Sequence, residues 1–348
     1  MTTRQPPADP NRQAWQKTAY WRAWVLLAER QSAHALAVLE EARRSDGRST
    51  PLELLDDRTQ RLHARLLIWS GQFDEGRNLL LRLAERLSSK NATLHEDTGG
   101  NRFLADLMID INAIGHHEQA IAAGTRLYEA SQTSRRRALR GTNLGSWHID
   151  HGFAMECNGN AEGAATAYNK AIALITEALA YRSAQFAKDE KRWAAHYGST
   201  LSQLVRAKTR QALMNRDPAS LDEIIDQART ALKLMLLSDE APPATVGLRV
   251  GRLGAAHLHR ARLSHPDDPH ALVENLERPV TALQWAWASM TTGYLWPMTA
   301  LDYADALSLA DRPVEARATY REALRRLEGQ CGPEYPPCRV FRQRDADL

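Results

Sequence analysis

Apolar residues recur at three- and four-residue spacing along most of the chain, and no convincing run of alternating β-branched residues interrupts them. Alanine, leucine, arginine and glutamate are abundant, and all four occur commonly in helices. Short polar breaks such as 45–49, 215–219 and 264–268 separate the periodic segments. The pattern predicts an all-α protein of about fourteen helices.

Four segments share one further pattern, in which a turn residue is followed by a small residue five positions later. The turn residues are Gly71, Gly115, Gly159 and Asp311. The small residues are Gly76, Ala120, Ala164 and Ala316. Two more positions are shared. The first, four residues after the small residue, holds Leu80, Gly124, Tyr168 and Tyr320. The second, three residues further on, holds Leu83, Leu127, Ala171 and Ala323. At the first of these two positions, Gly124 alone is not a large residue.

This pattern resembles the second helix of a tetratricopeptide (TPR) repeat, where small residues let two helices pack closely and a larger residue fills the gap. Gly152 stands at the family's small position in the first helix, so we expect it to face Ala164 across a helix pair. His148 replaces the tryptophan of the family, and the proline that ends a repeat is missing. Anchors recur every 41 to 44 residues, which is longer than the usual TPR period of about 34 residues.

The long spacing is similar to that of extended TPR-like domains in some bacterial regulators. The resemblance implies a right-handed α-solenoid of antiparallel helix pairs, with seven pairs in all. It also implies a division of the chain into a disordered N-terminus at 1–10, TPR-like repeats at 11–185, irregular helical repeats at 186–296, a TPR-like C-terminal repeat at 297–328 and a C-terminal tail at 329–348.

Length and charge restrict the function classes. A chain of 348 residues exceeds the size of one core, which requires either several domains or an array of repeats. The net charge of +3 is close to balance, and the one basic run, SRRRALRG, reads as a solvated helix start, so nucleic acid is not an expected partner. The N-terminus lacks an apolar leader, and no window approaches about 18 uninterrupted apolar residues. We expect a soluble cytoplasmic protein with no membrane partner.

One short stretch invites a metal or catalytic interpretation. His148, Asp150 and His151 lie within four residues, but the two histidines fall at positions that repeat packing uses, and Asp150 points away from their shared face. Nothing in the sequence nominates a third and a fourth metal ligand. His257 and His259 are two residues apart and therefore lie on different helix faces. We expect packed histidines, no metal and no cofactor.

Cysteines and catalytic motifs add little. Cys331 and Cys338 bracket the segment CGPEYPPC, but we expect these thiols and Cys157 to be unpaired. The motifs of serine hydrolases, P-loop proteins, zinc proteases and dinucleotide-binding enzymes are absent. No catalytic residue is therefore nominated, and a non-catalytic protein or peptide scaffold or regulator is the expected function. The alternative is a helical enzyme or small-ligand-binding protein, which a closed pocket with converging polar groups would favour over an open groove.

Candidate binding residues lie in the N-terminal half. In a TPR-like register, the first helix at about 50–70 turns a row of arginines toward a concave groove, and aromatic residues lie upstream on the same face. The predicted binding residues are Tyr20, Trp24, Arg58, Arg61, Arg65 and Arg102. Guanidinium groups bind carboxylates well, so an acidic protein or peptide is the expected partner. A solvated arginine face without a ligand is the alternative.

Overall fold

The computed structural model describes residues 10–29, 31–44, 55–90, 99–237, 243–290 and 294–348, and within these ranges it contains sixteen α-helices and no strand. The chain divides into two compact units at residues 1–90 and 91–348, called unit 1 and unit 2 below. The all-α class is confirmed. The helix number exceeds the expected fourteen, and the shortest helices, α12 and α16, have 6 and 11 residues. The start of the expected disordered N-terminus, at 1–9, lies outside the described residues.

Unit 1 contains four helices: α1 (Pro10–Ala28), α2 (Ser32–Arg44), α3 (Asp57–Trp69) and α4 (Phe73–Lys90). Unit 2 begins with α5 (Gly99–Ala113), α6 (His117–Glu129), α7 (Ser134–Cys157), α8 (Ala161–Phe186), α9 (Glu190–Asn215) and α10 (Pro218–Leu236). It continues with α11 (Pro243–Ser264), α12 (Pro269–Glu274), α13 (Glu277–Ser289), α14 (Pro297–Leu309), α15 (Pro313–Cys331) and α16 (Pro336–Ala346).

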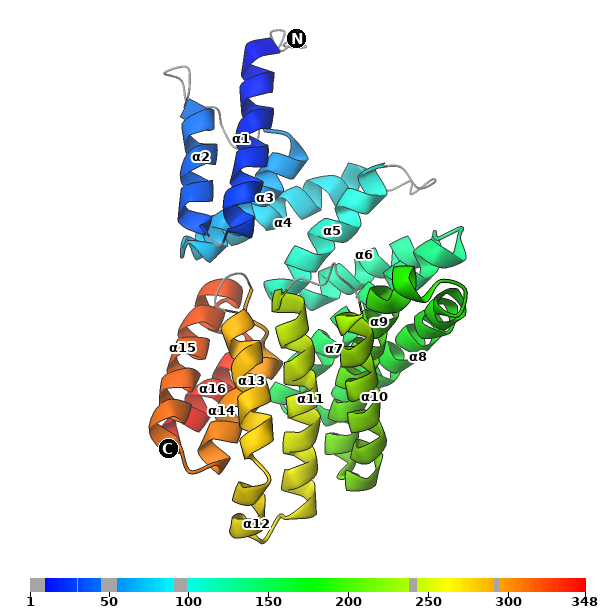
Figure 1. The fold of residues 1–348 in the computed structure, drawn as a ribbon. Helices are drawn as coiled ribbons and strands as arrows, with labels where there is room; N and C mark the ends of the chain where they lie inside the picture. Colours follow the sequence, from blue (N-terminus) through cyan, green and yellow to red (C-terminus); the bar gives the residue numbers. More distant parts are fainter. Residues whose placement is uncertain (1–9, 30, 45–54, 91–98, 238–242, 291–293) are drawn as a thin grey trace. The chain divides into compact units, whose positions relative to one another are not determined.

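Each unit is built from antiparallel helix pairs that follow one another along the chain (Figure 1). The pairs of unit 1 are α1 with α2 and α3 with α4. In unit 2 the pairs are α5 with α6, α7 with α8, α9 with α10, α11 with α13, and α14 with α15. The first helices of successive pairs also contact each other, from α5 to α7, α9, α11 and α14. These first helices therefore line the interior of unit 2.

The predicted turn residues do join the helices of each pair. Gly71, Gly115, Gly159 and Asp311 all have positive φ angles, between 57° and 91°. In each turn, the next residue donates its N–H to a carbonyl five positions back, as in the 2.9 Å bond from Asn160 to Met155. This bonding satisfies carbonyls at the helix end. The residue type at the turn is thus set by local backbone geometry.

The positions predicted to pack the second helices are buried in all four segments. The turn at Arg216, whose φ is 53°, begins a fifth segment of the same kind that lies inside the region expected to be irregular. Its equivalent positions are Leu221, Ile225 and Ala228, all buried. A leucine replaces the small residue there, which is why the sequence pattern did not reveal this segment.

Glycines mark the closest approaches of the helix pairs. A Cβ atom on Gly152 would lie 2.9 Å from the Tyr168 ring and 3.2 Å from the Ala167 Cβ, so its nearest side chains are these and not the expected Ala164. Gly124, which departs from the repeat pattern, lies against the ring of Trp147. The gap left by the missing large residue is therefore filled by an aromatic side chain of α7.

The C-terminal helices return to the first helices of unit 2. Helix α16, in the segment expected to be a tail, packs against α7, and its Phe341 is fully buried. The Gln330 side-chain amide donates a 2.6 Å hydrogen bond to the Ala113 carbonyl oxygen. Figure 1 shows these helices beside α7 and α14. Unit 2 is thereby closed by contacts between segments far apart in the sequence, and the inner helix faces become buried.

Buried side chains such as Gln330, Cys338 and Phe341 therefore attach the segment 329–348 to the core of unit 2, while 342–344 are exposed. The repeat boundaries expected at 185 and 296 do not coincide with the division at residue 90, and they stay a prediction about repeat regularity. No helix of the described segments combines the length and hydrophobicity needed to cross a bilayer.

We expect Ala164→Trp to lower the free energy of unfolding by about 1–3 kcal/mol, because Ala164 is fully buried and a larger side chain overpacks its site. Urea unfolding followed by circular dichroism measures the effect. Ala173→Trp on the same helix is the control, because Ala173 is exposed. Equal unfolding midpoints for the two variants would contradict the packing assigned to the second helix.

Candidate functional site

The structure distributes the predicted binding residues over both units. Tyr20 and Trp24 lie one turn apart on α1, with ring centroids 6.4 Å apart. Arg65 on α3 lies over two indole rings, with its Cζ atom 5.7 Å from the Trp24 centroid and 4.6 Å from that of Trp69. Trp24 and Arg65 are therefore brought together as a cation–π cluster. Their predicted role in binding stays a prediction.

The remaining arginines of the predicted row differ in their environments. Arg58 is exposed and Arg61 is half-buried on α3. Arg102 is exposed on α5 and belongs to unit 2, whereas Arg58, Arg61 and Arg65 belong to unit 1. Arg58, Arg61 and Arg65 share α3, and the continuation of the row to Arg102 stays a prediction.

A network of polar side chains fills the interior of unit 2. Asp150 on α7 forms a buried ion pair with Arg206 on α9, and their side chains are only 7% and 9% exposed. Asn112 donates a 2.6 Å hydrogen bond to Asp150, and its own oxygen lies 2.8 Å from Nδ1 of His117. His117 Nε2 lies 3.0 Å from the Tyr335 hydroxyl. One chain of contacts therefore links α5, α6, α7 and α9 to the start of α16.

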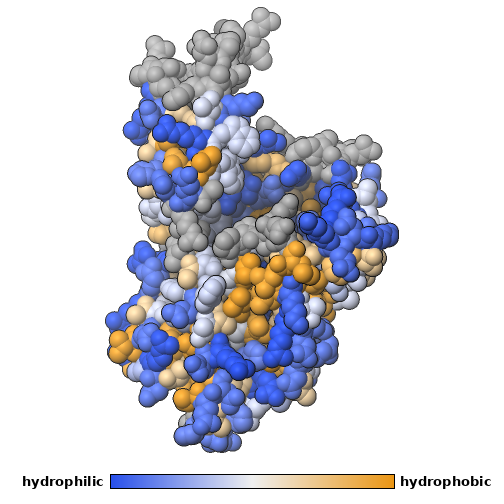
Figure 2. Space-filling view, viewed as in Figure 1, coloured by the Kyte–Doolittle hydropathy of each residue, from blue (hydrophilic) through white to orange (hydrophobic). Residues whose placement is uncertain are grey.

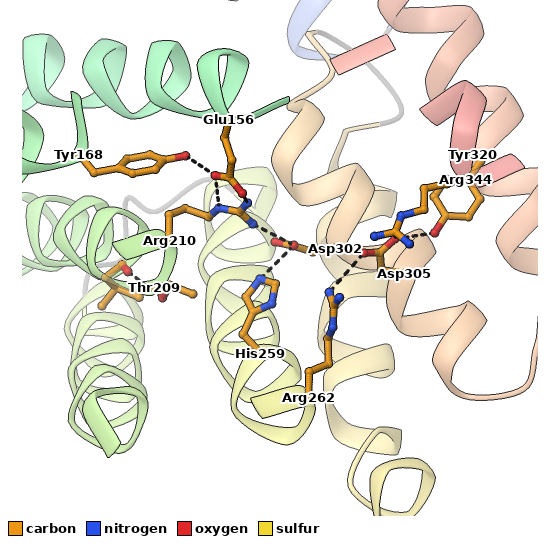
Figure 3. Close-up of polar contacts among 11 residues, drawn as sticks. Glu156, Tyr168, Thr209, Arg210, His259, Arg262, Asp302, Asp305, Tyr320 and Arg344 are labelled. Atoms are coloured by element: carbon orange, nitrogen blue, oxygen red, sulfur yellow. Dashed lines mark hydrogen bonds and ion pairs between the residues drawn. The ribbon is translucent and has the colours of Figure 1, made fainter. Parts of the chain in front are cut away.

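A second group of polar side chains surrounds Arg210 in unit 2 (Figure 3). Glu156 accepts hydrogen bonds from Arg210 and, at 2.9 Å, from the Tyr168 hydroxyl. Asp302 lies 4.0 Å from Arg210 and 3.1 Å from Nε2 of His259. Burial alone would lower the pKa of Arg210, but Glu156 and the neighbouring Tyr168 and Asp302 raise it. The guanidinium group is therefore charged and compensated.

A third group surrounds Asp305 on α14, at the other side of Figure 3. The Tyr320 hydroxyl donates a 2.5 Å hydrogen bond to Asp305. Arg262 and Arg344 lie 3.4 and 3.7 Å from the same carboxylate. Burial, followed by the Asp305 charge, raises the pKa of Tyr320, so this phenol stays neutral and acts as a donor. These contacts hold α11, α14, α15 and α16 together.

The interior leaves little space. A cavity of about 20 Å³ is lined by Arg206, Arg252, Thr209 and Asp302 among others, which is room for about one water molecule. The converging polar groups resemble what we expected of an enzyme, but most of their polar atoms bond to one another. The arrangement as it stands has no room for a substrate in this cavity.

Two larger hollows lie on the surface of unit 2, where α6, α7 and α8 meet. Their volumes are about 560 and 520 Å³. They adjoin, because both are lined by Glu118, His151, Met155 and Asn160. We call the combined depression the outer groove.

His148 and His151 line the outer groove. Burial, with help from Lys170 and His151, lowers the pKa of His148 to about 4, and burial also lowers the pKa of His151. Both rings are therefore neutral at pH 7. Asp150 points instead into the interior, as expected for the opposite face of α7. In the described part of the chain, no group of three or more histidine, cysteine, aspartate or glutamate residues is placed to hold a metal ion.

The other singled-out residues are packed. His259 is buried beside Asp302, whereas His257 is half-buried, so the two lie on different helix faces as expected. Among the described residues, Cys157, Cys331 and Cys338 form no disulfide. Burial raises the pKa of Cys157 to about 12, so this thiol is protonated at neutral pH.

Exposed apolar side chains form one further feature. Hydrophobic side chains gather over α10 and α11 in Figure 2. Leu236 and Leu237, at the end of α10, are 65% and 63% exposed. They adjoin residues 238–242, which lie outside the described part of the chain. The outer groove is therefore the better-defined site.

Sequence reasoning missed the interior arginines. Arg206 and Arg210 are four residues apart on α9, and Arg249 and Arg252 are three apart on α11, in segments otherwise rich in small and apolar residues. Arginines on the inner face of a helix that is expected to be buried are unusual and indicate a paired or ligand-binding role. That spacing was a detectable signal.

Comparisons with known proteins add no family. No family model matches the chain, and no curated protein matches it. The hypoxic regulator of sterol synthesis Nro1, described as a nuclear import adaptor, is similar over 95% of this chain and 92% of its own, with 14% identity and a TM-score of 0.30. A circular tandem repeat protein with novel repeat topology is similar over 95% and 78%, with 16% identity and a TM-score of 0.24. Because both scores are low, the helical-repeat fold rests on the helix pairing itself.

We expect Asp150→Asn to destabilise the protein by about 3–5 kcal/mol, because it leaves the buried Arg206 guanidinium without its carboxylate. Equilibrium unfolding in urea measures the change. Asp222→Asn is the control, since the Asp222–Arg260 pair is 61% and 43% exposed and such surface pairs contribute about 1 kcal/mol or less. A loss below about 1 kcal/mol in Asp150→Asn would contradict the role assigned to the buried pair.

Stability should also fall on mild acidification. Burial lowers the pKa of both His117 and His148 from 6.5 to about 4, so between these pH values the unfolded chain binds protons that the folded chain does not. The two histidines therefore leave the free energy of unfolding unchanged above pH 6.5 and lower it progressively as the pH falls toward 4. Thermal unfolding across this range measures the slope. His148→Gln should have a shallower slope than the parent, and parallel slopes would refute the assignment.

Proposed function

We propose that this chain is a soluble, cytoplasmic helical-repeat protein that binds a protein partner, and that the outer groove of unit 2 receives a peptide segment of that partner. The observation that carries the proposal is the continuity of the two hollows along α6, α7 and α8. A groove between neighbouring helices is a common place for peptide binding. The repeat is TPR-like in its turns and small residues.

The lining of the outer groove suits a peptide with an apolar anchor. Ile121, Ala122, Met155 and Ala167 supply apolar surface, and Met155 adapts readily to different side chains. His148 is neutral at pH 7 and adds an aromatic ring without a charge. Such a mixture of apolar surface and a few polar groups is typical of binding sites.

Charges of both signs surround that apolar surface. Glu118 and Glu162 are acidic, whereas Lys170 is basic, and all three are exposed. Exposed charges of this kind influence orientation and association rate more than affinity. We therefore infer a partner segment with an apolar side chain at its centre and charged residues on both sides.

Helix α7, which lines the outer groove, is held in place by buried contacts on its other side. On α7, Asp150 and Phe153 are buried on the side away from His148 and His151. The ion pair of Asp150 with Arg206 attaches this helix to α9. A groove whose floor is already ordered loses little conformational entropy on binding, which favours affinity.

The N-terminal arginine face is the second candidate surface for the same function. Trp21 and Val25 are 60% and 58% exposed beside Tyr20 and Trp24 on α1. An acidic or carboxylate-bearing segment would meet Arg58 and Arg61 on α3, and Arg102 was predicted for the same role. Arg65 is engaged with Trp24 and Trp69, so replacing it would disturb the fold as well as binding.

The enzyme alternative has less support. The converging polar groups of unit 2 bond largely to each other, and the cavity beside them has about 20 Å³. A binding protein needs a stable framework and an accessible groove, and both features are present. The proposal therefore favours binding over catalysis.

Affinity capture from the native cytoplasm identifies the partner, and titration calorimetry with the purified partner then tests the site. Ala122→Arg should weaken binding at least about tenfold, because Ala122 is an exposed residue of the outer groove and a long side chain would occupy it. Ala180→Arg, at an exposed position of α8 outside the lining residues, should bind like the parent.

A third variant shows whether the partner binds to the outer groove or to the arginine face of unit 1. The double variant Arg58→Glu, Arg61→Glu should leave binding unchanged if the partner occupies the outer groove. Loss of binding in this variant, with Ala122→Arg unaffected, would move the site to unit 1. If no variant weakens binding, both surface assignments are wrong.

A further inference from the structure

Two arginines in the interior of unit 2 have no carboxylate partner among the described residues. Arg249 and Arg252 lie three residues apart on α11. Arg249 is only 8% exposed and donates a 3.0 Å hydrogen bond from Nη2 to the Ser199 hydroxyl, while its buried Nε has no acceptor in the described structure. Arg252 donates a 2.8 Å bond from Nη1 to the Ser202 hydroxyl. A neutral hydroxyl does not compensate a buried positive charge.

A third arginine increases the excess of positive charge. Burial, and then the charge of Arg206, lowers the pKa of Arg249 to about 10. Burial and the charges of Arg249 and Arg206 lower the pKa of Arg252, against the opposing effect of Asp150. Arg206 and Arg252 line the same small cavity, and Arg249 lies one helical turn from Arg252 on α11, so the three guanidinium groups are neighbours. Asp150 pairs with Arg206, so the cluster has three positive charges and one negative charge.

Two other arginines of unit 2 show the usual solution, a carboxylate partner. Arg210 meets Glu156, and Arg262 meets Asp305 at 3.4 Å. Buried arginines normally have such partners, because removing an unpaired charge from water is costly. Arg182 also lacks a carboxylate, but it is a single buried arginine that donates a 2.7 Å hydrogen bond to the His196 carbonyl oxygen. Arg249 and Arg252 lie side by side without a carboxylate, which points to a negative group that binds from outside the chain.

The register of two helices arranges the donors. Ser199, Ser202 and Arg206 follow one another at spacings of three and four along α9, and thus lie on one face. Arg249 and Arg252 present the matching face of α11, which packs against α9. Arg249 donates a hydrogen bond to Ser199, and Arg252 donates one to Ser202. The small cavity lined by Arg206 and Arg252 adjoins this row.

We infer that Arg206, Arg249 and Arg252, with Ser199 and Ser202, form a binding site for a phosphate group carried by a small molecule or present as the free anion. A phosphate monoester brings a charge of about −1.5 to −2 at pH 7, which matches the two guanidinium groups that lack a carboxylate. Guanidinium forks bind its oxygens with two parallel hydrogen bonds. A single carboxylate would offset only half of the excess. This site lies in the interior and is independent of the outer groove.

Entry of the anion requires only local movement. Arg252 is partly exposed, and each of Arg249 and Arg252 is held by one serine hydroxyl. Rotation of these long side chains toward an incoming phosphate would enlarge the present cavity of about 20 Å³.

Thermal unfolding and titration calorimetry of the full chain test the site, with inorganic phosphate, AMP and succinate as probes at constant ionic strength in chloride. Phosphate or AMP should raise the unfolding temperature in a saturable way, and succinate should have a smaller effect. Arg249→Gln and Arg252→Gln should each weaken phosphate binding at least about tenfold, since each removes a charge-assisted hydrogen-bond donor. Arg229→Gln, at an exposed arginine of α10, is the matched control and should bind like the parent.

The same variants also test whether Arg249 and Arg252 have only a structural role. Without phosphate, Arg249→Gln should be at least as stable as the parent, because it removes a buried charge that has no carboxylate partner. Arg252→Lys keeps the charge but loses the planar fork, and should bind phosphate with intermediate affinity. Saturation by inorganic phosphate alone identifies the free anion, whereas tighter binding of AMP identifies an organic phosphate. The inference fails if no phosphate probe binds, if the glutamine variants bind like the parent, or if succinate binds as tightly as phosphate.

Discussion

The buried ion pair between Asp150 and Arg206 is the contact on which the rest of unit 2 depends. It joins α7 to α9, and through Asn112 and His117 it reaches Tyr335 at the start of α16. Charged and polar groups removed from water are tolerated only when they are bonded, so their partners must arrive in the correct register. The network therefore favours one arrangement of these helices over alternatives in which they slide past each other.

This constraint changes where a partner can bind. In an open array of helix pairs, the inner faces of the first helices form a concave binding surface. In unit 2, α15 and α16 pack back toward α5 and α7, and the inner faces are occupied by ion pairs and hydrogen bonds. The outer groove lies on the other side of α7, the side that carries His148 and His151. The same helix thus serves the core with one face and the outer groove with the other.

The interior charges are not fully balanced, and the imbalance is local. Around Glu156 and Asp302, each arginine has a carboxylate within reach, and the helices are held together. Around Arg249 and Arg252, serine hydroxyls are the acceptors. Both regions involve residues of α9 and α11. The helices that stabilise the fold therefore also carry the two arginines that lack a carboxylate.

The all-α class, the helix pairing and the turns followed from the sequence by itself, because they depend on contacts between residues close in the chain. A glycine with positive φ at residue 159 and small residues at spacings of four and five are local features. Of the candidate site, the proximity of Trp24 and Arg65 was implied by helix faces, and the placement of His148 and His151 away from Asp150 followed from helical geometry.

Only the tertiary structure decided which faces are buried and which arginines lack a carboxylate. His117 and Tyr335 are 218 residues apart, and Asp150 and Arg206 are 56 apart. No local spacing encodes such contacts, because they arise from the cumulative curvature of successive helix pairs. The expected C-terminal tail became part of the core for the same reason. Whether an arginine on an inner helix face meets a carboxylate or a serine depends on the register of helices that are not adjacent in the chain.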